Sequence, residues 1–460
     1  MNRMKPYQAV LIILCFCLAP IPSANALPQT APVRAQARET FKFTQVDLDL
    51  LEQVKLLDRR FEKEGLVYND DALNGYLDRI GKAVLPADTH PENVEWRFRI
   101  LRDPLPNAFA LPNGSIYINM GLLTLLDNEA QLASVLAHET VHVLNRHTYL
   151  QNRSNRKKVL AINIIQAIGF WTPGGGVAGA TINLIASIAP LILESSMFGY
   201  SRDLEREADL EGLNLLARAS YPTPEMINAF KLLKKDIEGE RLKLFYSDHP
   251  QLDERIAYVN NIIYGKGQPA TPEKAADKTG TEYISTIEKA ARHDTQLATN
   301  AGRYRTAFFV SKKLVDFNPR SSENLFYLAE AYRTLGPRAP ELTEKELTSG
   351  AKKKAAKKRE KLTPEEEEKE LLATPAGQEN WKVNRQKAEL LYVQALELNA
   401  SNYLVHRGLG MLYEKSQRNR EAIREYQRYL ELAPDAPDRE RINYRLENLK
   451  GLESAGASRI

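Results

Sequence analysis

Cysteine is almost absent from this sequence: its 460 residues contain only Cys15 and Cys17. Both lie within residues 1–26, which start with basic residues, continue through a short apolar run and end in small residues, as a secretory signal peptide does. We expect this segment to be removed and the mature chain to be exported without any cysteine. Disulfides are then excluded, so the fold must be stabilised by its hydrophobic core or by a metal ion.

Long hydrophobic runs and an excess of charge of one sign are absent as well. The apolar run in the signal peptide ends at Pro20 and Pro22, well short of the roughly 20 residues that a membrane-spanning helix requires. The net charge is only +4, so the composition predicts no nucleic-acid partner. With 43% hydrophobic and 27% charged residues, the chain is neither wholly disordered nor a multispanning membrane protein.

The length is too great for one compact unit and indicates two or three domains. Residues 27–41 are rich in proline and alanine without a period, which predicts a flexible leader. Within residues 42–268, apolar residues recur at helical spacing and then alternate with polar ones, which predicts an α+β domain that is mostly helical with a small sheet. The helical spacing covers 46–61 and 70–80, and the alternation covers 96–100 and 116–118.

The strongest chemical signal is His138-Glu139-Thr140-Val141-His142, set in an apolar segment that we predict to be a helix from Asn128 to Arg146. On a helix the two histidines lie one turn apart and can bind a single ion. Glu139 lies between them and can take a proton from a water that Zn²⁺ makes acidic, then pass it to a leaving amine. Burial of three ionisable groups is costly without a function, so we interpret the motif as a catalytic zinc site.

A catalytic zinc normally has three protein ligands and one open position, so a third ligand is needed. The metzincin pattern is excluded, because Asn145 and Thr148 stand where that pattern has a glycine and a histidine. His147 follows His142 by five residues and would lie about 140° around a continued helix, so we expect a surface histidine there.

Acidic residues supply the remaining candidates for the third ligand. None occurs from Val143 to Leu193, and the first cluster after the motif includes Glu205, Glu207 and Asp209. Glu205 and Asp209 share a helix face, which lets one bind metal while the other orients a ligating imidazole. Spacing alone leaves the choice between Glu205 and Glu207 open.

Two apolar stretches within residues 159–193 predict a helical hairpin, each arm being too short to span a bilayer. A lid or buried interface and a peripheral contact with lipid fit this pattern equally well, since apolar length does not distinguish them.

The last part of the chain is repetitive, with small and aromatic residues that return after about 34 residues, as in a tetratricopeptide repeat. We predict an all-α tetratricopeptide-repeat solenoid over residues 269–460, ending in a capping helix from Arg439 to Leu452. A charged insert at 337–380 displaces the second half of an early repeat and is expected to be solvated. The recurring positions are Ala388, Tyr392 and Ala400, then Ala422, Tyr426 and Pro434, with an earlier copy at Ala307, Leu314, Pro319, Leu325, Ala329 and Tyr332.

Four features in this order resemble the HtpX and BepA type of zinc metallopeptidases, which are related to CAAX prenyl proteases. The resemblance covers roughly residues 45–265, and the repeats behind it make the arrangement most similar to the BepA branch. It implies that Glu205 is the third ligand of one Zn²⁺ per chain. The features are Asn107 to Pro112 with Gly114 and Gly121 to Leu123, the His138 to His142 motif, Ser201 to Asp209, and His249-Pro250 with Arg255-Ile256.

His249 has no fixed role in the family pattern. It is expected either to stabilise the oxyanion or to occupy the open zinc position, and capping or packing explains a histidine beside a proline equally well.

The motif predicts a zinc-dependent endopeptidase whose substrate adds in extended form along the strand at 116–119. Its substrate-binding residues would be Asn107, Ile116, Tyr117, Ile118 and Asn119. The resemblance implies a periplasmic enzyme whose substrates are misassembled outer-membrane proteins and whose repeats dock on the barrel-assembly machinery.

Two other functions are compatible with the sequence. A repeat-based periplasmic chaperone or scaffold with a structural or latent zinc site has no need of Glu139. A lipid-modifying or prenyl-protein hydrolase would need an enclosed apolar chamber, for which two short apolar helices are insufficient.

Overall fold

The computed structural model describes residues 41–87, 91–154, 200–240, 252–265, 278–340 and 363–457. The predicted signal peptide, the leader up to residue 40, the apolar hairpin at 159–193 and His249 lie outside these described residues. No helix within the described ranges is long and apolar enough to cross a membrane.

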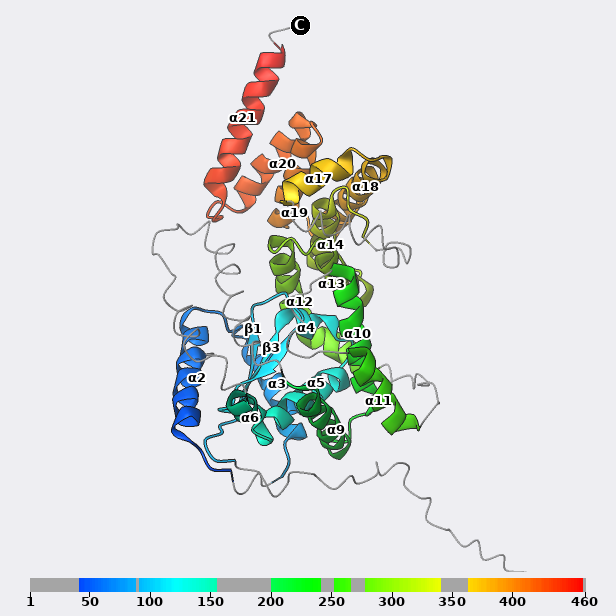
Figure 1. The fold of residues 1–460 in the computed structure, drawn as a ribbon. Coiled ribbons are helices and arrows are strands. Elements are labelled where there is room, and N and C mark those ends of the chain that lie inside the picture. The colour runs from blue at the N-terminus through cyan, green and yellow to red at the C-terminus, as the bar shows by residue number, and fades with distance from the viewer. Residues whose placement is uncertain are drawn as a thin grey trace, which may run out of the picture.

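The N-terminal part surrounds a three-stranded sheet with helices (Figure 1). The strands lie in the order β1-β3-β2, with β3 parallel to β1 and antiparallel to β2. The elements are α2 (Gln45–Lys63), α3 (Asp71–Val84), β1 (Arg97–Leu101), β2 (Ala108–Ala110), β3 (Ser115–Asn119), α4 (Met120–Leu125), α5 (Glu129–Leu144), α6 (His147–Ser154), α9 (Arg202–Arg218), α10 (Pro224–Glu240) and α11 (Leu252–Tyr264).

The periodicities in the sequence predicted most of these elements correctly. Helices α2, α3 and α5 lie where apolar residues have helical spacing, and β1 and β3 lie where they alternate. Strand β2 has only three residues, too few for a period to be seen. The mostly helical α+β architecture with a small sheet is therefore confirmed.

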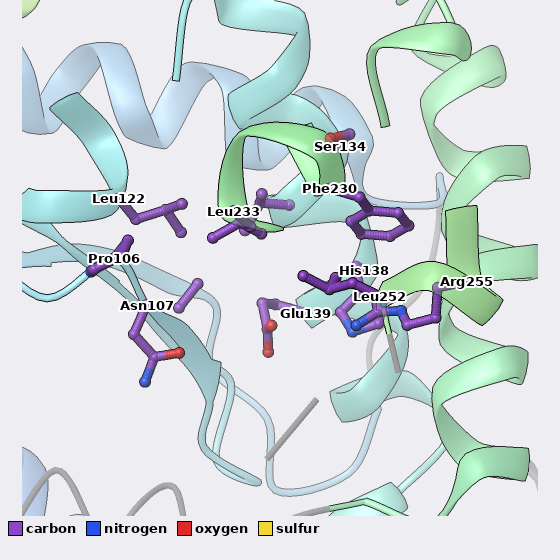
Figure 2. Close-up of a pocket in the computed structure, with 12 residues that line it drawn as sticks. Pro106, Asn107, Leu122, Ser134, His138, Glu139, Phe230, Leu233, Leu252 and Arg255 are labelled. Carbon is purple, nitrogen blue, oxygen red and sulfur yellow. The ribbon is translucent and has the colours of Figure 1, made fainter. Parts of the chain in front are cut away.

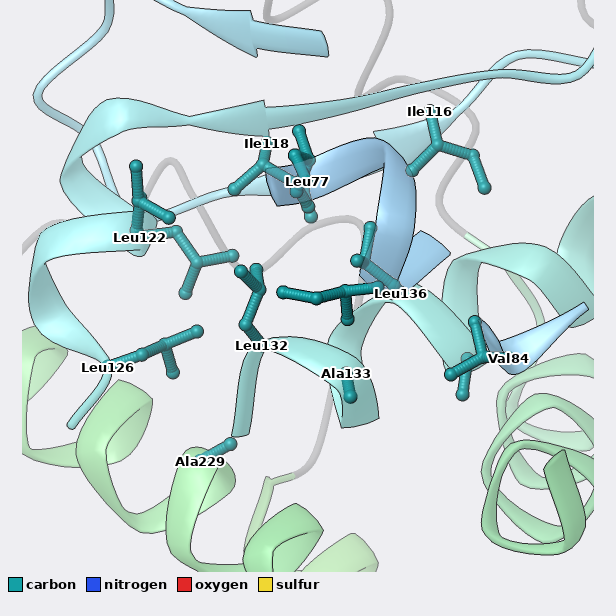
Figure 3. Packing of buried hydrophobic residues seen from close by; sticks show 14 of the residues in the cluster. Leu77, Val84, Ile116, Ile118, Leu122, Leu126, Leu132, Ala133, Leu136 and Ala229 are labelled. Atoms are coloured by element: carbon teal, nitrogen blue, oxygen red, sulfur yellow. The ribbon is translucent and has the colours of Figure 1, made fainter. Parts of the chain in front are cut away.

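The sheet is covered on both faces, which explains why all of β3 is buried. Its Ile116 and Ile118 face a large core shared with α3, α5, α9 and α10 (Figure 3). Tyr117 points to the other face and joins a second core with Phe61 and other residues of α2. The alternation of side chains along the strand thus fixes which layer each helix joins.

A buried carboxylate fastens α2 to the sheet. Asp58 accepts hydrogen bonds from Asn113 Nδ2 at 2.6 Å, Ser115 Oγ at 2.7 Å and Tyr117 Oη at 2.8 Å. Because every one of these donors lies in β3 or the turn before it, α2 is held in register with the strand.

The C-terminal part is entirely helical in its described residues and extends away from the sheet (Figure 1). Helix α14 packs against α18, although residues 336–374 separate the two helices along the chain. The end of the charged insert forms α17 and the start of α18. The helices are α12 (Lys278–Asn300), α13 (Tyr304–Phe317), α14 (Ser322–Leu335), α17 (Pro364–Leu372), α18 (Pro375–Leu398), α19 (Tyr403–Lys415), α20 (Asn419–Leu432) and α21 (Arg439–Ala457).

Helix α12 joins the two parts of the chain. Its Tyr283, Ile287 and Ala290 belong to the large core of the N-terminal part, and the helix also packs against α13. The first helix after residue 268 is therefore shared with the N-terminal core.

Candidate metal centre

Helix α5 places the His138 to His142 motif in the interior. Asn128 caps its first turn by accepting a hydrogen bond from the Gln131 amide at 2.9 Å, and thereafter the helix is almost wholly buried. Helix α9 crosses it closely at Gly212, where an added Cβ would lie 3.3 Å from the backbone of His138. The glycine thus lets α9 bring its acidic residues to the histidines.

Three candidate ligands meet at one point. The Nε2 atoms of His138 and His142 lie 3.0 Å apart, and Glu205 oxygens lie 3.6 Å and 3.4 Å from them respectively. One ligand atom from each of the three lies within 4.8 Å of the others, and all three residues are buried. Two imidazoles and one carboxylate form a donor set that suits catalytic zinc, so the residues fit this metal.

Asp209 orients the first of these imidazoles. Its Oδ1 lies 2.9 Å from Nδ1 of His138, which leaves Nε2 of that ring for the metal. Arg255 donates to both oxygens of Asp209, at 2.8 Å and 2.6 Å, and its Nη1 lies 3.1 Å from Glu205. Burial acts to raise the pKa of Asp209, but Arg255 and His138 outweigh it and lower the pKa to about 2. Asp209 therefore stays ionised at neutral pH.

His142 is held differently. The ring of Tyr200 stacks on it, with centroids 3.8 Å apart and planes 12° from parallel. Burial lowers the pKa of His142 well below its ordinary value, while Glu205 acts to raise it. A neutral imidazole is the form that binds metal.

The expectation that His147 lies at the surface is wrong. The residue is fully buried, and its Nδ1 lies 2.8 Å from Nδ1 of His142. The predicted angle assumed a continuous helix, but α5 ends at Leu144 and Arg146 adopts a positive φ of 57°. The chain turns back there, and α6 begins at His147.

Glu139 faces a pocket beside the candidate ligands (Figure 2). His138 and Arg255 form one side of it, and Asn107 lies on the opposite side. The remaining wall is largely apolar and is formed by Pro106, Ala108, Leu122, Ser134, Val135, Phe230, Leu233 and Leu252. The pocket thus combines a buried carboxylate with a lining that suits an apolar side chain.

The prediction that substrate adds beside β3 needs correction. Ile116 and Ile118 pair with both neighbouring strands, so neither edge of β3 is open. Of the predicted substrate residues, Asn107 lines the pocket, whereas Ile116, Tyr117, Ile118 and Asn119 are fully buried in the central strand. Periodicity predicted the strands but carried no information about their order.

The structure also separates the two glutamates between which spacing could not decide. Glu205 faces the two histidines, whereas Glu207 accepts a hydrogen bond from Asn145 Nδ2 at 2.8 Å. Two functional neighbours, Arg255 and Tyr200, received no role from the sequence. Arg255 lies far along the chain from the motif, so no local spacing could have assigned it to Glu205 and Asp209.

Comparison with known proteins agrees with this geometry. Residues 71–263 match the family model described as Peptidase family M48. The mitochondrial metalloendopeptidase OMA1 of Schizosaccharomyces pombe is 30% identical over 194 residues, covering 41% of this chain and 52% of the relative.

Two further relatives are named for barrel assembly. The putative beta-barrel assembly-enhancing protease of Vibrio cholerae is 28% identical over 252 residues, covering 53% of this chain and 50% of the relative. The beta-barrel assembly-enhancing protease of Escherichia coli is 25% identical over 260 residues, covering 53% and 51%. The chain thus spans about half the length of the curated relatives it matches.

The residues that match the family model include the motif, the acidic helix α9 and Arg255. Zinc is the metal of this family, and the buried cluster of two histidines and a glutamate suits it. Residues 71–263 are therefore similar to peptidase family M48, in agreement with the resemblance to the HtpX and BepA type of zinc metallopeptidases.

Proposed function

We propose that the chain is a zinc-dependent endopeptidase in which His138, His142 and Glu205 hold the metal and Glu139 is the general base. The observation that carries this proposal is the convergence of the three ligand atoms within 4.8 Å, next to a pocket into which Glu139 points. A purely structural site has four protein ligands and no use for a neighbouring base.

The metal and Glu139 would have different roles in peptide hydrolysis. Bound zinc would polarise the scissile carbonyl and make a nearby water more acidic. Glu139 takes the proton from the attacking water and transfers it to the nitrogen of the leaving amine. The carboxylate is buried beside His138, so it is fixed in position for both transfers.

The outer edge of β2 is the proposed substrate path. Asn107 accepts a backbone hydrogen bond from Asn119, and Leu111 donates one to Ser115. Ala108 and Ala110 therefore direct their backbone groups away from β3. No strand in the described part of the chain pairs with that edge. An extended peptide there would run past Ala108, which lines the pocket together with Glu139.

Replacing Glu139 with glutamine tests the assignment. The Glu139→Gln variant should bind one zinc per chain, as the parent does, and should lose at least about 100-fold in cleavage of an unfolded protein such as casein, because the general base is gone. Zinc is measured by metal analysis and cleavage by release of peptides.

The matched control is Glu254→Gln, an exposed carboxylate next to Arg255 that lies outside the pocket. It should keep parental activity. Undiminished proteolysis by the Glu139→Gln protein would refute the assignment of Glu139.

The biological role is also a proposal: a periplasmic protease that removes misassembled outer-membrane proteins and assists their assembly. Support comes from the signal-like sequence at 1–26 and from two relatives whose names refer to β-barrel assembly. A purified protein incubated with an unfolded outer-membrane protein should degrade it. If instead the parent leaves that substrate uncut, and both the parent and the Glu139→Gln variant keep it from aggregating, the chain acts as a chaperone or scaffold.

The helices from α12 to α21 are proposed to form tetratricopeptide repeats that select substrates or dock on the barrel-assembly machinery. Close packing supports this interpretation, because Gly408 lies against the ring of Tyr392 and Gly410 against the ring of Tyr426. Small residues beneath aromatic rings are what such repeats need for their helices to stack. Truncation after residue 300 should abolish co-purification with the assembly machinery if this proposal is correct.

A further inference from the structure

The turn that ends α5 directs a third histidine into the metal centre. Arg146 supports the turn: its side chain donates to the carbonyl of Glu92 at 2.8 Å and lies 5.3 Å from the ring centre of Phe43. The next residue, His147, is fully buried and enters the space behind His142, on the side away from Glu205.

The distance between the two rings requires one proton between them. Their Nδ1 atoms are 2.8 Å apart, so one of these atoms must carry a proton and the other must accept it. When His142 binds zinc through Nε2, its proton is on Nδ1 and the Nδ1 lone pair of His147 accepts it. His147 then carries its own proton on Nε2, and Oε2 of Glu207 lies 3.8 Å from that atom.

We propose that His147 is a positioning residue for the zinc ligand His142, with a neutral imidazole in the place where His138 has the carboxylate of Asp209. The inference rests on the proposed zinc site. The hydrogen bond fixes both the tautomer and the ring orientation of His142, so that its Nε2 lone pair points toward the metal.

Two contacts hold this arrangement in place. Asn145 donates to Oε1 of Glu207 at 2.8 Å, which keeps that carboxylate near His147. On the other side, Tyr200 stacks on His142, and its hydroxyl lies 3.0 Å from Oγ1 of Thr148. His142 is thus restrained in its plane by His147 and across its face by Tyr200.

The two ligating histidines therefore have unequal partners. Oδ1 of Asp209 lies 2.9 Å from Nδ1 of His138, and a carboxylate partner increases the electron density of a ligating ring. A neutral imidazole increases the electron density of its partner ring less than a carboxylate does. The main effect of His147 on His142 is therefore on the orientation of the ring. Loss of the acceptor should weaken zinc binding while leaving the protein folded.

Three substitutions separate the hydrogen bond from packing. His147→Phe keeps a ring of similar size without an acceptor, and His147→Asn places its side-chain oxygen near the position of Nδ1. His293→Phe is the matched control, a half-buried histidine that stacks on Tyr68 in another part of the molecule. Zinc dissociation constants of the full chain are measured by competition with a chelator, and thermal unfolding of the metal-free proteins reports the fold.

The expected result is a zinc affinity about 10- to 100-fold weaker for His147→Phe, with His147→Asn and His293→Phe within a few fold of the parent. Equal affinities for the parent and His147→Phe would overturn the inference. So would equal losses for Phe and Asn, because the ring would then matter only for packing. If the parent itself binds no zinc, the proposed function fails instead, and the two failures are therefore distinguishable.

Discussion

Arg255 is surrounded by the acidic groups of the metal centre. It is buried, makes two hydrogen bonds to Asp209, approaches Glu205 at 3.1 Å and lies 4.4 Å from the ring centre of Phe230. Burial acts to lower the pKa of Arg255, but Asp209 and Glu205 raise it above its ordinary value. Its charge is therefore permanent, and it balances two carboxylates that the fold takes out of water.

We predict that Arg255→Met destabilises the metal-free protein by about 3–5 kcal/mol, because Asp209 and Glu205 remain buried without their cation. Added zinc should recover part of this loss, since a divalent ion supplies positive charge at the same point. Unfolding by urea with and without zinc measures both effects.

The control for Arg255 is Arg79→Met. Arg79 pairs with Glu129 at 2.8 Å, but 55% of its side chain is exposed. Its removal should cost at most about 1 kcal/mol. A metal-free Arg255→Met protein as stable as the parent would contradict the charge argument.

Residue-level predictions succeeded where they depended on one helix and failed where the chain turned. The shared face of Glu205 and Asp209 follows from helical geometry, and the structure places Asp209 on His138 and Glu205 beside both imidazoles. His147 was misplaced because its position depends on where α5 ends, and the αL conformation of Arg146 was not apparent from its residue type.

At the level of secondary-structure elements, the close approach of α18 and α19 is the feature most open to test. A Cβ added at Gly408 would lie 2.6 Å from the ring of Tyr392, and Tyr392 is fully buried. The two helices can therefore pack at this distance only with glycine at position 408.

Gly408→Ala is predicted to destabilise the C-terminal helices by about 1–3 kcal/mol through overpacking. Thermal unfolding of the full chain measures this loss of stability. Zinc affinity should stay unchanged, because the helices lie outside the metal centre.

Gly451→Ala in α21 is the control, since nothing lies within 4 Å of its added Cβ. That variant should gain up to about 1 kcal/mol from helix propensity. Equal stability of both variants would exclude close packing at Gly408.

Strand order is a second property of the elements that local patterns did not contain. Alternating apolar residues identified β1 and β3, but β3 lies between β1 and the short β2, so a substrate cannot add beside it. Hydrogen bonding between strands is a contact between distant parts of the chain, so the identity of the edge strand emerges only after folding.

At the scale of the whole molecule, the N-terminal core and the helical array meet at the loop before β2. Arg303 donates to the carbonyl of Pro104, and Asp103 in the same loop accepts from the Leu105 amide at 2.8 Å. Burial raises the pKa of Asp103 to about 6, although the Leu105 amide and Arg303 oppose the shift.

The raised pKa of Asp103 predicts a pH dependence. The unfolded chain ionises this carboxyl near pH 4 and the folded chain near pH 6, so stability falls as pH rises between these values. Asp103→Asn keeps the acceptor for Leu105 and removes the ionisation. It should be more stable than the parent by about 1–3 kcal/mol at pH 8, with a smaller difference at pH 4.

Denaturant unfolding at both pH values measures this difference. Asp435→Asn, at an exposed position, is the control for exchanging a carboxylate for an amide. A constant difference between Asp103→Asn and the parent from pH 4 to pH 8 would contradict the assignment of the raised pKa.

The sequence by itself determined the features that depend on neighbours in the chain. These are the helices and strands with clear periods, the placement of Glu139 between two histidines on one helix, and the pairing of Glu205 with Asp209 on another. The reason is that helical and strand geometry convert spacing directly into a shared face.

Tertiary structure decided which of these faces meet. It brought α9 onto α5 at Gly212, placed Arg255 between two carboxylates, turned His147 toward His142 and enclosed β3 between two strands. Each of these contacts joins residues across a turn or a long stretch of chain, where the packing of whole elements sets the distance and local periodicity has no influence.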